Sequence, residues 1–196
     1  MDYGEYVSDT MQAIAKIDRS KIDKAVDILF KAWKKGATVY TCGNGGSAST
    51  ASHMVCDLAK CTIVDGKKRL RVIGLVDNIP WVSALTNDNG WDNVYYEQLL
   101  NYFTAGDVLI GLSVHGGKGR DQAGAWTQNV LKAIDYVNQT GGFSIGLTGF
   151  DGGEMEKICT VNINVPVDST PIVESLHCWV EHYMANKLKD KIEKKR

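Results

Sequence analysis

Two segments far apart in the chain carry residue types that could do chemistry at one site. The first is the glycine-rich stretch CGNGGSAS at 42–49 and the helix-like run that follows it, and the second is TPIVESLHCWVEH at 170–182. A glycine-rich turn at the start of a helix presents backbone N–H groups to a phosphate. Carboxylate and imidazole side chains serve as metal ligands or as acids and bases, and here they are His53, Asp57, Glu174, His177 and His182. The two segments together suggest chemistry on a small phosphorylated molecule.

The glycine-rich turn is suited to binding phosphate, but a simpler interpretation stays open. It holds three glycines, Asn44 tolerates a left-handed backbone, and Ser47 stands at the expected N-cap of the next helix. The same residues would also make a tight strand-to-helix connection with no ligand. The turn lacks the GK[ST] of a Walker A loop and the GxGxxG of a dinucleotide fold, so a nucleotide ligand is disfavoured.

The carboxylate and histidine pairs are spaced for shared helix faces. His53 and Asp57 are four residues apart, and Glu174 and His182 are eight apart, or about two turns. Each pair alone is more typical of a surface or capping interaction than of a metal site. His177 lies three residues after Glu174 and competes with it for the same role.

Two other features of the sequence favour a structural role over ligand binding. The run Asn87-Asp88-Asn89-Gly90 predicts a turn and a helix entry more than a ligand contact. The tryptophans at 81, 91, 126 and 179 are more typical of packing residues than of ligand stackers.

Composition limits the class of protein. The 196 residues are 44% hydrophobic and 23% charged with a net charge of −1, so bulk electrostatics gives no reason to expect a nucleic-acid or membrane partner. No apolar run reaches membrane-spanning length, and the basic stretch KLKDKIEKKR predicts a solvated helix end. Five cysteines without a CxxC pair indicate free thiols in a reducing cytoplasm.

The chain after residue 37 alternates strand and helix patterns. Two helices are expected within 5–34. Strands are expected at 38–42, 70–75, 107–113, 143–147 and 160–165, and helices near 48–60, 91–103, 127–140 and 171–190. This alternation predicts a doubly wound α/β domain with a parallel sheet. We therefore expect one domain over 1–196, with a helical extension at 1–36 and an α/β sandwich at 37–196. The apolar face of the extension would be buried either in an oligomer or on its own domain.

Two glycine-containing turns are expected at the same edge of this sheet. GNGGSAS follows the first predicted strand, and SVHGGKGRDQAG follows the third. Ligands of open α/β sheets bind beyond the carboxyl ends of the strands, which places both turns near one crevice.

The motifs, in their order along the chain, resemble those of one family. They are CGNGGSAS with His53 and a carboxylate four residues on, TNDNG at 86–90, GDVLIGLS at 106–113, NVLKAI at 129–134, IGLTGFDGG at 145–153, and TPxxExxHxxxxH at 170–182. With these motifs the chain resembles the sugar isomerase (SIS) domain proteins, and among them the phosphoheptose isomerase group.

This resemblance implies a three-layer α/β/α fold of the flavodoxin or Rossmann type, with a five-stranded parallel sheet. It implies a homotetramer in which the N-terminal helices pack together and the active sites form between subunits. The family reaction interconverts sedoheptulose 7-phosphate and D-glycero-D-manno-heptose 7-phosphate, often with one bound zinc ion. The implied metal ligands are His53, Asp57, Glu174 and His182. The implied substrate contacts are Asn44, Gly45, Gly46, Ser47, Asn87, Asp88 and Ser113, with Asp57 and Glu174.

The sequence departs from the family pattern in three places. Asp57 stands where the family usually has Glu, and Glu174 stands where many members have Gln. The serine-rich phosphate loop SxSGNSxNV is SVHGGKGRDQAGAWTQNV here, which leaves about nine extra residues near 117–125. With Ser113 aligned to its first serine, His115 replaces a middle serine and Thr127 matches the last. His115 and Thr127 are then candidate phosphate contacts, and Thr127 is a candidate helix cap. A surface loop that only changes access to the site is the competing interpretation.

An aldose–ketose isomerisation through a cis-enediol needs a base at the carbons and a group that moves a proton between the oxygens. Asp57 is expected to act as the base and His182 to move a proton between the oxygens, with zinc polarising the carbonyl and Glu174 as the rival base. Two alternatives stay open. The chain could isomerise a different sugar phosphate, or it could be a non-catalytic SIS protein that binds a phosphosugar or a protein partner, as a DnaA-binding relative does. The retained acid–base set favours an enzyme.

Overall fold

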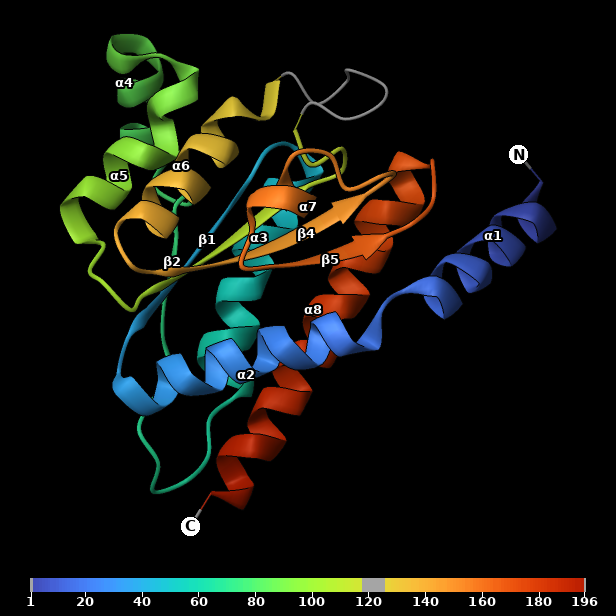
Figure 1. Cartoon of the computed structure of the whole chain (residues 1–196), viewed down its shortest axis with the longest axis horizontal. Coiled ribbons are helices and arrows are strands. Elements are labelled where there is room, and N and C mark those ends of the chain that lie inside the picture. The colour runs from blue at the N-terminus through green and yellow to red at the C-terminus, as the bar shows by residue number, and fades with distance from the viewer. Residues whose placement is uncertain (1, 118–125, 196) are drawn as a thin grey trace.

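The chain forms a five-stranded parallel sheet with helices on both faces (Figure 1). The computed structural model describes residues 2–117 and 126–195. The strands are β1 (Thr38–Gly43), β2 (Arg71–Gly74), β3 (Val108–Ser113), β4 (Phe143–Gly149) and β5 (Val161–Val165). Their order across the sheet is β2-β1-β3-β4-β5, and every neighbouring pair is parallel. The predicted α/β fold is confirmed.

Helices alternate with the strands along the described chain. They are α1 (Tyr3–Lys16), α2 (Arg19–Lys35), α3 (Gly46–Cys56), α4 (Ile79–Asn89), α5 (Val94–Tyr102), α6 (Gln128–Gln139), α7 (Met155–Ile158) and α8 (Thr170–Lys194), with a π-helical turn η1 (Asp57–Cys61) and a 3₁₀ turn η2 (Trp91–Asn93). Of these, the sequence did not predict α4 and α7. None of the described helices is both long and apolar enough to cross a membrane.

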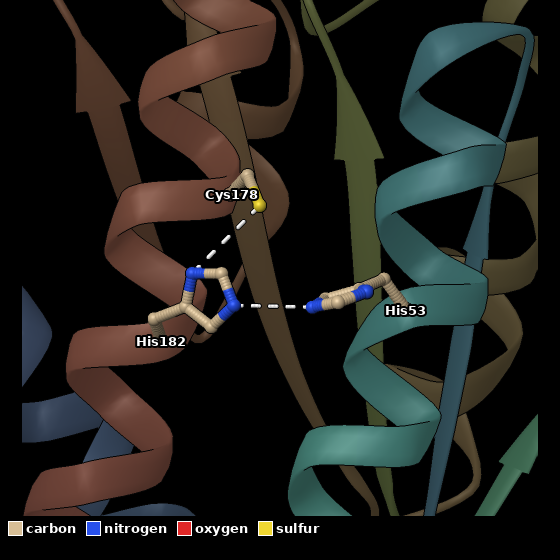
Figure 2. A group of neighbouring side chains, drawn as sticks. All are labelled: His53, Cys178 and His182. Atoms are coloured by element: carbon tan, nitrogen blue, oxygen red, sulfur yellow. Dashed lines mark hydrogen bonds between the residues drawn. The ribbon is translucent and has the colours of Figure 1, made fainter.

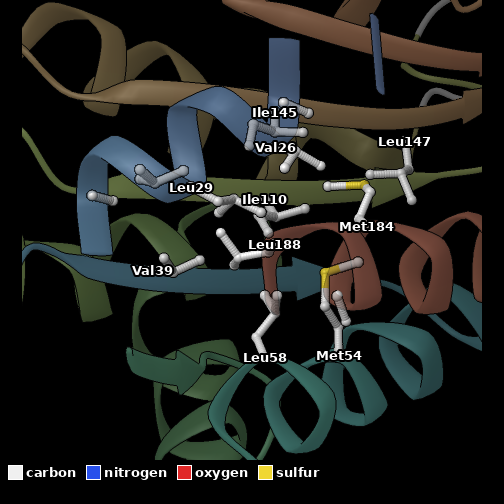
Figure 3. Close-up of a cluster of buried hydrophobic side chains, with 14 of the residues drawn as sticks. Val26, Leu29, Val39, Met54, Leu58, Ile110, Ile145, Leu147, Met184 and Leu188 are labelled. Carbon is white, nitrogen blue, oxygen red and sulfur yellow. The ribbon is translucent and has the colours of Figure 1, made fainter. Parts of the chain in front are cut away.

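The main core lies on the sheet face that α2, α3 and α8 cover. Val26 and Leu29 of α2, Met54 of α3 and Leu188 of α8 converge there on strand residues such as Ile110 (Figure 3). A second core, centred on Leu109 and the apolar faces of α5 and α6, fills the other face. Every residue of β1 and β3 is buried, as expected for strands covered on both sides. This packing fixes α3 and α8 side by side, and the candidate site lies between them.

The two N-terminal helices differ in how they are packed. Helix α2 is N-capped by Asp18, ends at Gly36 in the left-handed conformation (φ +74°), and packs along α8. Helix α1 extends from the domain (Figure 1), and among its residues only Ala13 is buried. Thus the domain itself buries α2, while Tyr3 and Met11 of α1 remain exposed.

The NDNG run both closes one helix and leads into the next. Asn87 and Asp88 lie in the last turns of α4, and Gly90, with φ +84°, separates α4 from η2. The predicted turn and helix entry are therefore confirmed, but the helix that ends at this turn was not predicted. Helix α4 starts at an Asn78 cap with Pro80 in its first turn, and none of its residues is buried. Without a buried stripe, the sequence lacks the apolar periodicity by which such a helix is usually found.

Candidate active site between α3 and α8

The glycine-rich turn connects β1 to α3 through close backbone contacts. A Cβ on Gly43 would lie 2.8 Å from the backbone of Ser47 and 3.0 Å from the Leu112 carbonyl oxygen, so a larger residue does not fit. Gly45, with φ +56°, occupies the N-cap position that we expected for Ser47. Ser47 is instead a buried residue of the first helical turn. The turn thus leaves the start of α3 uncapped by any side chain, as a phosphate- or sugar-binding turn requires.

Asn44 is held rigidly at the tip of this turn. Its amide exchanges two hydrogen bonds with the Asn129 amide, at 2.9 and 3.0 Å. The Tyr95 hydroxyl donates to the Gly43 carbonyl oxygen at 2.5 Å and lies 3.3 Å from Asn44 Oδ1. Burial raises the pKa of Tyr95, which keeps its hydroxyl a donor at neutral pH. The turn is therefore tied to α5 and α6 before any ligand binds.

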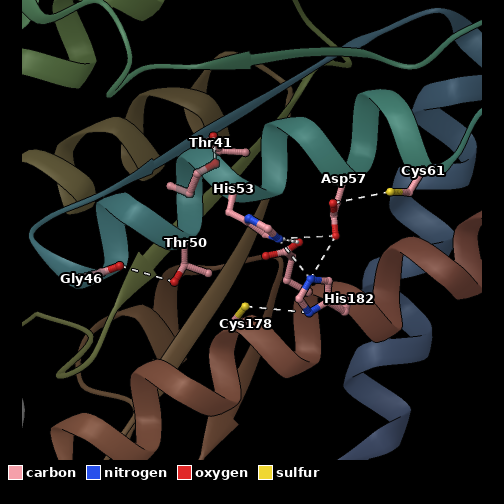
Figure 4. A network of polar contacts seen from close by, with 10 residues as sticks. Thr41, Gly46, Thr50, His53, Asp57, Cys61, Cys178 and His182 are labelled. Atoms are coloured by element: carbon pink, nitrogen blue, oxygen red, sulfur yellow. Dashed lines mark hydrogen bonds and ion pairs between the residues drawn. The ribbon is translucent and has the colours of Figure 1, made fainter.

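Two histidines from different helices meet between α3 and α8. Figure 2 shows the rings of His53 and His182 pointing toward each other, and their Nε2 atoms are 3.1 Å apart. Asp57 Oδ2 lies 3.3 Å from His182 Nε2 and 3.8 Å from His53 Nε2 (Figure 4). Cys178 Sγ lies 3.8 Å from the other ring nitrogen of His182, Nδ1. The structure thus brings together three of the four residues expected to bind metal.

The fourth side chain in this cluster is Glu181, which sequence reasoning missed. Its Oε1 lies 3.9 Å from His53 Nε2, and the ligand atoms of His53, Asp57, Glu181 and His182 all lie within 4.8 Å of one another. Burial and the neighbouring Asp57 carboxyl raise the pKa of Glu181 to about 8. Glu181 lies on a row of α8 residues that are spaced by four, Val173, His177, Glu181 and Ala185, and all four are buried. This spacing is the signal by which the sequence could have identified it.

Asp57 stands where the helix geometry changes. It is the C-cap residue of α3, one turn after His53, and the first residue of the π-helical turn η1. Single π turns inside helices are frequent at functional sites because they redirect side chains. The Cys61 thiol donates to Asp57 Oδ1 at 3.5 Å, which leaves Oδ2 facing the histidines.

The other two candidates on α8 lie elsewhere. Glu174 packs its carboxyl against Gly46, since a Cβ on Gly46 would meet Glu174 Oε1 at 2.3 Å. It therefore lies at the first turn of α3, where a helix N-terminus favours negative charge. His177 is buried and bonds the Thr148 carbonyl oxygen through Nε2 at 3.0 Å. Burial lowers the pKa of His177 to about 4, so it is a neutral packing residue at physiological pH.

The candidate phosphate contacts gather at the end of β3. Ser113 Oγ lies 3.2 Å from Thr127 Oγ1 and accepts a hydrogen bond from the Gly116 N–H. Thr127 occupies the N-cap position of α6, as expected, but its side chain makes no capping bond. The His115 ring packs on Phe150 at a centroid distance of 4.3 Å. Most of the predicted insertion, residues 118–125, lies outside the described residues.

Asn87 and Asp88 are not brought to the cluster. Both are exposed, and they bond to each other, from Asn87 Nδ2 to Asp88 Oδ1 at 2.8 Å. Helix α4 packs on α5 and η2, and in Figure 1 it lies at the upper left beyond α5, on the opposite side of the picture from α8.

The donor set of the cluster fits a divalent transition metal. Two imidazoles and two carboxylates are ordinary zinc ligands, and neither oxygen of the buried Glu181 has a hydrogen-bond partner among the described residues. A buried carboxyl without a partner is costly unless it is protonated or binds a cation. The same groups can also move protons. The arrangement therefore suits acid–base chemistry with or without a metal.

Comparison with known proteins relates the chain to one family. Residues 2–149 match the SIS domain family. The chain is 32% identical over 174 residues to a phosphoheptose isomerase from Aliarcobacter butzleri, covering 89% of this chain and 87% of that protein. It is 39% identical over 180 residues to the lincomycin biosynthesis protein LmbN of Streptomyces lincolnensis, covering 90% of this chain. The chain spans only 64% of the length of that second relative.

Solved structures have the same fold. The phosphoheptose isomerase GmhA from Neisseria gonorrhoeae superposes with a TM-score of 0.82 at 26% identity, covering 96% of this chain and 95% of that one. A phosphoheptose isomerase from Francisella tularensis gives a TM-score of 0.84 at 20% identity, over 95% of this chain and 96% of that one. At 20% identity, the Francisella tularensis structure shows a similar fold and nothing more.

Proposed function

The chain belongs to the SIS domain family, and we propose that it is an aldose–ketose isomerase of the phosphoheptose isomerase type. Its reaction would interconvert sedoheptulose 7-phosphate and D-glycero-D-manno-heptose 7-phosphate through an enediol. Relatives and a solved structure that bear the name phosphoheptose isomerase support this assignment over nearly the full chain.

One observation carries the proposal. Two helices that are far apart in sequence place His53, Asp57 and His182 within 3.8 Å of one another, and one of them, α3, begins at the glycine-rich turn. A non-catalytic phosphosugar-binding protein would need the turn but not this acid–base set. An isomerase needs both.

The proton transfers are assigned to residues of this chain. Asp57 would remove the proton from one carbon of the C1–C2 pair and return it to the other. His182 would carry the matching proton between the two oxygens, and its 3.3 Å contact with Asp57 keeps its ring in place. Glu174 remains the rival base. A zinc ion held by His53, Asp57, His182 and a second carboxylate would supply Lewis-acid polarisation of the carbonyl.

The sugar phosphate would occupy the region of the glycine-rich turn. The backbone of Gly45, Gly46 and Ser47 at the start of α3 and the amide of Asn44 would contact the sugar. Ser113 and Thr127, whose hydroxyls are already 3.2 Å apart, would bind the phosphate, with His115 nearby.

The exposed apolar residues of α1 support a homotetramer with active sites between subunits. Tyr3, Val7 and Met11 of α1 are exposed apolar residues. A groove of about 290 Å³ beside them is lined by Ile14, Ile17, Arg19, Ile22, Trp179 and Tyr183. Packing of the N-terminal helices of several copies would cover these surfaces, and would let Asn87 and Asp88 act at a site shared with another subunit. Size-exclusion chromatography with light scattering measures the assembly directly.

A reducing, cytoplasmic location is part of the proposal. All five cysteines are free thiols, and Cys42 is fully buried. Free buried cysteines are typical of proteins that work where thiols stay reduced.

The decisive experiment follows sedoheptulose 7-phosphate by NMR with the purified full chain, before and after chelation. We expect a new aldose phosphate, and loss of turnover when metal is removed. Five- and six-carbon sugar phosphates serve as the comparison panel. No turnover of any sugar would contradict the assignment and favour a binding protein.

A second candidate is an isomerase for a different sugar phosphate. The relative with 39% identity is named for lincomycin biosynthesis, and the loop after Ser113 departs from the family pattern. Turnover confined to another member of the sugar panel would favour this candidate.

A further inference from the structure

A pair of asparagine amides joins the start of α6 to the glycine-rich turn. Asn44 Nδ2 donates to Asn129 Oδ1 at 3.0 Å, and Asn129 Nδ2 donates to Asn44 Oδ1 at 2.9 Å. Asn129 is fully buried, and the two residues are 85 positions apart in the chain. A buried amide that bonds both ends of a second amide fixes the orientation of that side chain.

The first turn of α6 decides which way round both amides lie. The Val130 N–H donates to Asn129 Oδ1 at 2.8 Å. This N–H belongs to the start of α6, where backbone donors have no partner within the helix and the Thr127 side chain caps none of them. Because Asn129 Oδ1 is thereby fixed as the acceptor, the atom of Asn44 that faces it is Nδ2. The start of the helix therefore orients Asn129, and Asn129 orients Asn44.

Asn44 is left with one N–H that a ligand can use. Its Oδ1 already accepts from Asn129 and lies 3.3 Å from the Tyr95 hydroxyl. The second N–H of its Nδ2 makes only a long contact of 3.4 Å with the Trp126 carbonyl oxygen. A hydrogen bond of this length is weak, so an oxygen of a sugar can replace it. Asn44 is therefore a donor whose direction is set before the ligand arrives.

The same pair of amides links the two halves of the candidate site. Asn129 comes two residues after Thr127, whose hydroxyl lies 3.2 Å from Ser113 Oγ. These two hydroxyls are the candidate phosphate contacts, while Asn44 is a candidate sugar contact. Since the phosphate and the sugar belong to one molecule, a fixed spacing between the two sets of polar groups selects the ligand.

We propose that Asn129 is a positioning residue, which aims the Asn44 N–H at the sugar and holds the glycine-rich turn in register with the phosphate contacts. This inference rests on the proposed function, which assigns both sets of contacts. Because Asn129 is fully buried, it acts on the sugar only through its bonds to Asn44. It takes no part in proton transfer, so its loss raises KM and leaves kcat little changed.

Steady-state kinetics of the full chain on sedoheptulose 7-phosphate tests this role. Asn129→Ala should raise KM on the order of tenfold, about the effect of one lost hydrogen bond. Asn138→Ala is the matched control, because it makes the same change nine residues later on the same helix. The Asn138 amide also bonds two other elements, at the Ile158 carbonyl oxygen and the Ser144 hydroxyl. Asn138→Ala should keep the wild-type KM, and equal KM values for the two variants would overturn the proposal.

The double variant Asn44→Ala/Asn129→Ala shows whether the two amides act as one unit. If Asn129 acts only through Asn44, the double variant should have the kcat/KM of Asn44→Ala alone. Thermal unfolding of each variant confirms that it folds. A kcat/KM lowered by the product of the two single losses would mean that Asn129 acts independently of Asn44, and would overturn the proposal.

NMR of protein labelled with ¹⁵N-asparagine tests the pair without turnover. The Asn44 side-chain signals are those lost in Asn44→Ala. They should move to the shifts of a solvated amide in Asn129→Ala and stay in place in Asn138→Ala, and unchanged signals in Asn129→Ala would overturn the proposal. Titration with sedoheptulose 7-phosphate should then give a Kd about tenfold higher for Asn129→Ala than for the wild type. Such weakened binding without turnover would refute only the proposed function, and turnover with equal Kd values would refute only this inference.

Discussion

Helix α8 carries two carboxylate–histidine pairs, and the two have opposite environments. In the first pair Glu174 is partly exposed and His177 is buried and neutral. In the second pair Glu181 is fully buried and His182 is about half exposed. In the first pair Glu174 lies against Gly46 of α3 and His177 bonds the Thr148 carbonyl oxygen of β4, whereas the second pair lies against His53 and Asp57. The elements packed against α8, more than residue type or spacing, decide which pair joins the acid–base cluster.

The largest expected effect is in the cluster that His182 of the second pair forms with Asp57. Asp57→Asn and His182→Asn should each lower kcat by on the order of 10²–10⁴, because each removes a proton-transfer group. Steady-state NMR or coupled assays measure the loss, and circular dichroism confirms that the variants fold. Near-normal turnover in either variant would remove that residue from the mechanism.

A pH-dependent effect on stability is expected at the first pair. The pKa of His177 is lowered from 6.5 to about 4 in the folded protein, so the unfolded chain binds more protons between these values. The contribution of the neutral, buried ring is therefore fully present above pH 6.5 and is lost as the pH falls toward 4. The loss amounts to about 3 kcal/mol for this group.

A comparison with His177→Gln isolates this group from the other titrating residues. The free energy of unfolding, measured by denaturant titration from pH 7 to pH 4, should fall by about 3 kcal/mol more in the wild type than in the variant. Glutamine retains an N–H donor for the Thr148 carbonyl oxygen. Parallel curves for the two proteins would show that His177 is protonated in the folded state.

Glu174 should have a smaller effect that distinguishes its two possible roles. If Glu174 accepts a hydrogen bond from the sugar, Glu174→Gln should lower kcat/KM by on the order of tenfold, because one charged hydrogen bond is weakened. If Glu174 is the base instead of Asp57, kcat should fall by 10²–10⁴. The size of the loss therefore shows whether Glu174 is a positioning contact for the sugar or the base.

Much of the fold could be predicted from the sequence because its strands carry strong local signals. The runs VLIGLS and VNINV are apolar on both faces, and each falls within an observed strand of the parallel sheet. Helix α4 was missed for the opposite reason. It buries no residue, so no apolar stripe marks it, and its NDNG ending carries a turn signal.

The site was only partly predictable because side-chain contacts between helices depend on their packing. Spacing alone places His53 with Asp57, since both lie on one helix face. The pairing of α3 with α8 decides which residues of α8 meet them, and it brings Glu181 into the cluster while directing Glu174 to Gly46. No helical period in one segment contains that information.

The smallest expected effect tests the contact between Glu174 and Gly46. In Gly46→Ala, the new Cβ would meet the Glu174 carboxyl at 2.3 Å, and the end of a flexible side chain can move away. Stability should therefore stay within about 1 kcal/mol of the wild type, because alanine also favours the helix relative to glycine. The displaced carboxyl should lower kcat/KM about as much as Glu174→Gln does.

The double variant Gly46→Ala/Glu174→Gln shows whether the two changes act through one contact. If alanine acts only by displacing Glu174, the double variant should be no slower than either single variant, which is a strongly non-additive result. Additive losses would mean that alanine blocks the sugar directly, and that Glu174 works independently of the turn.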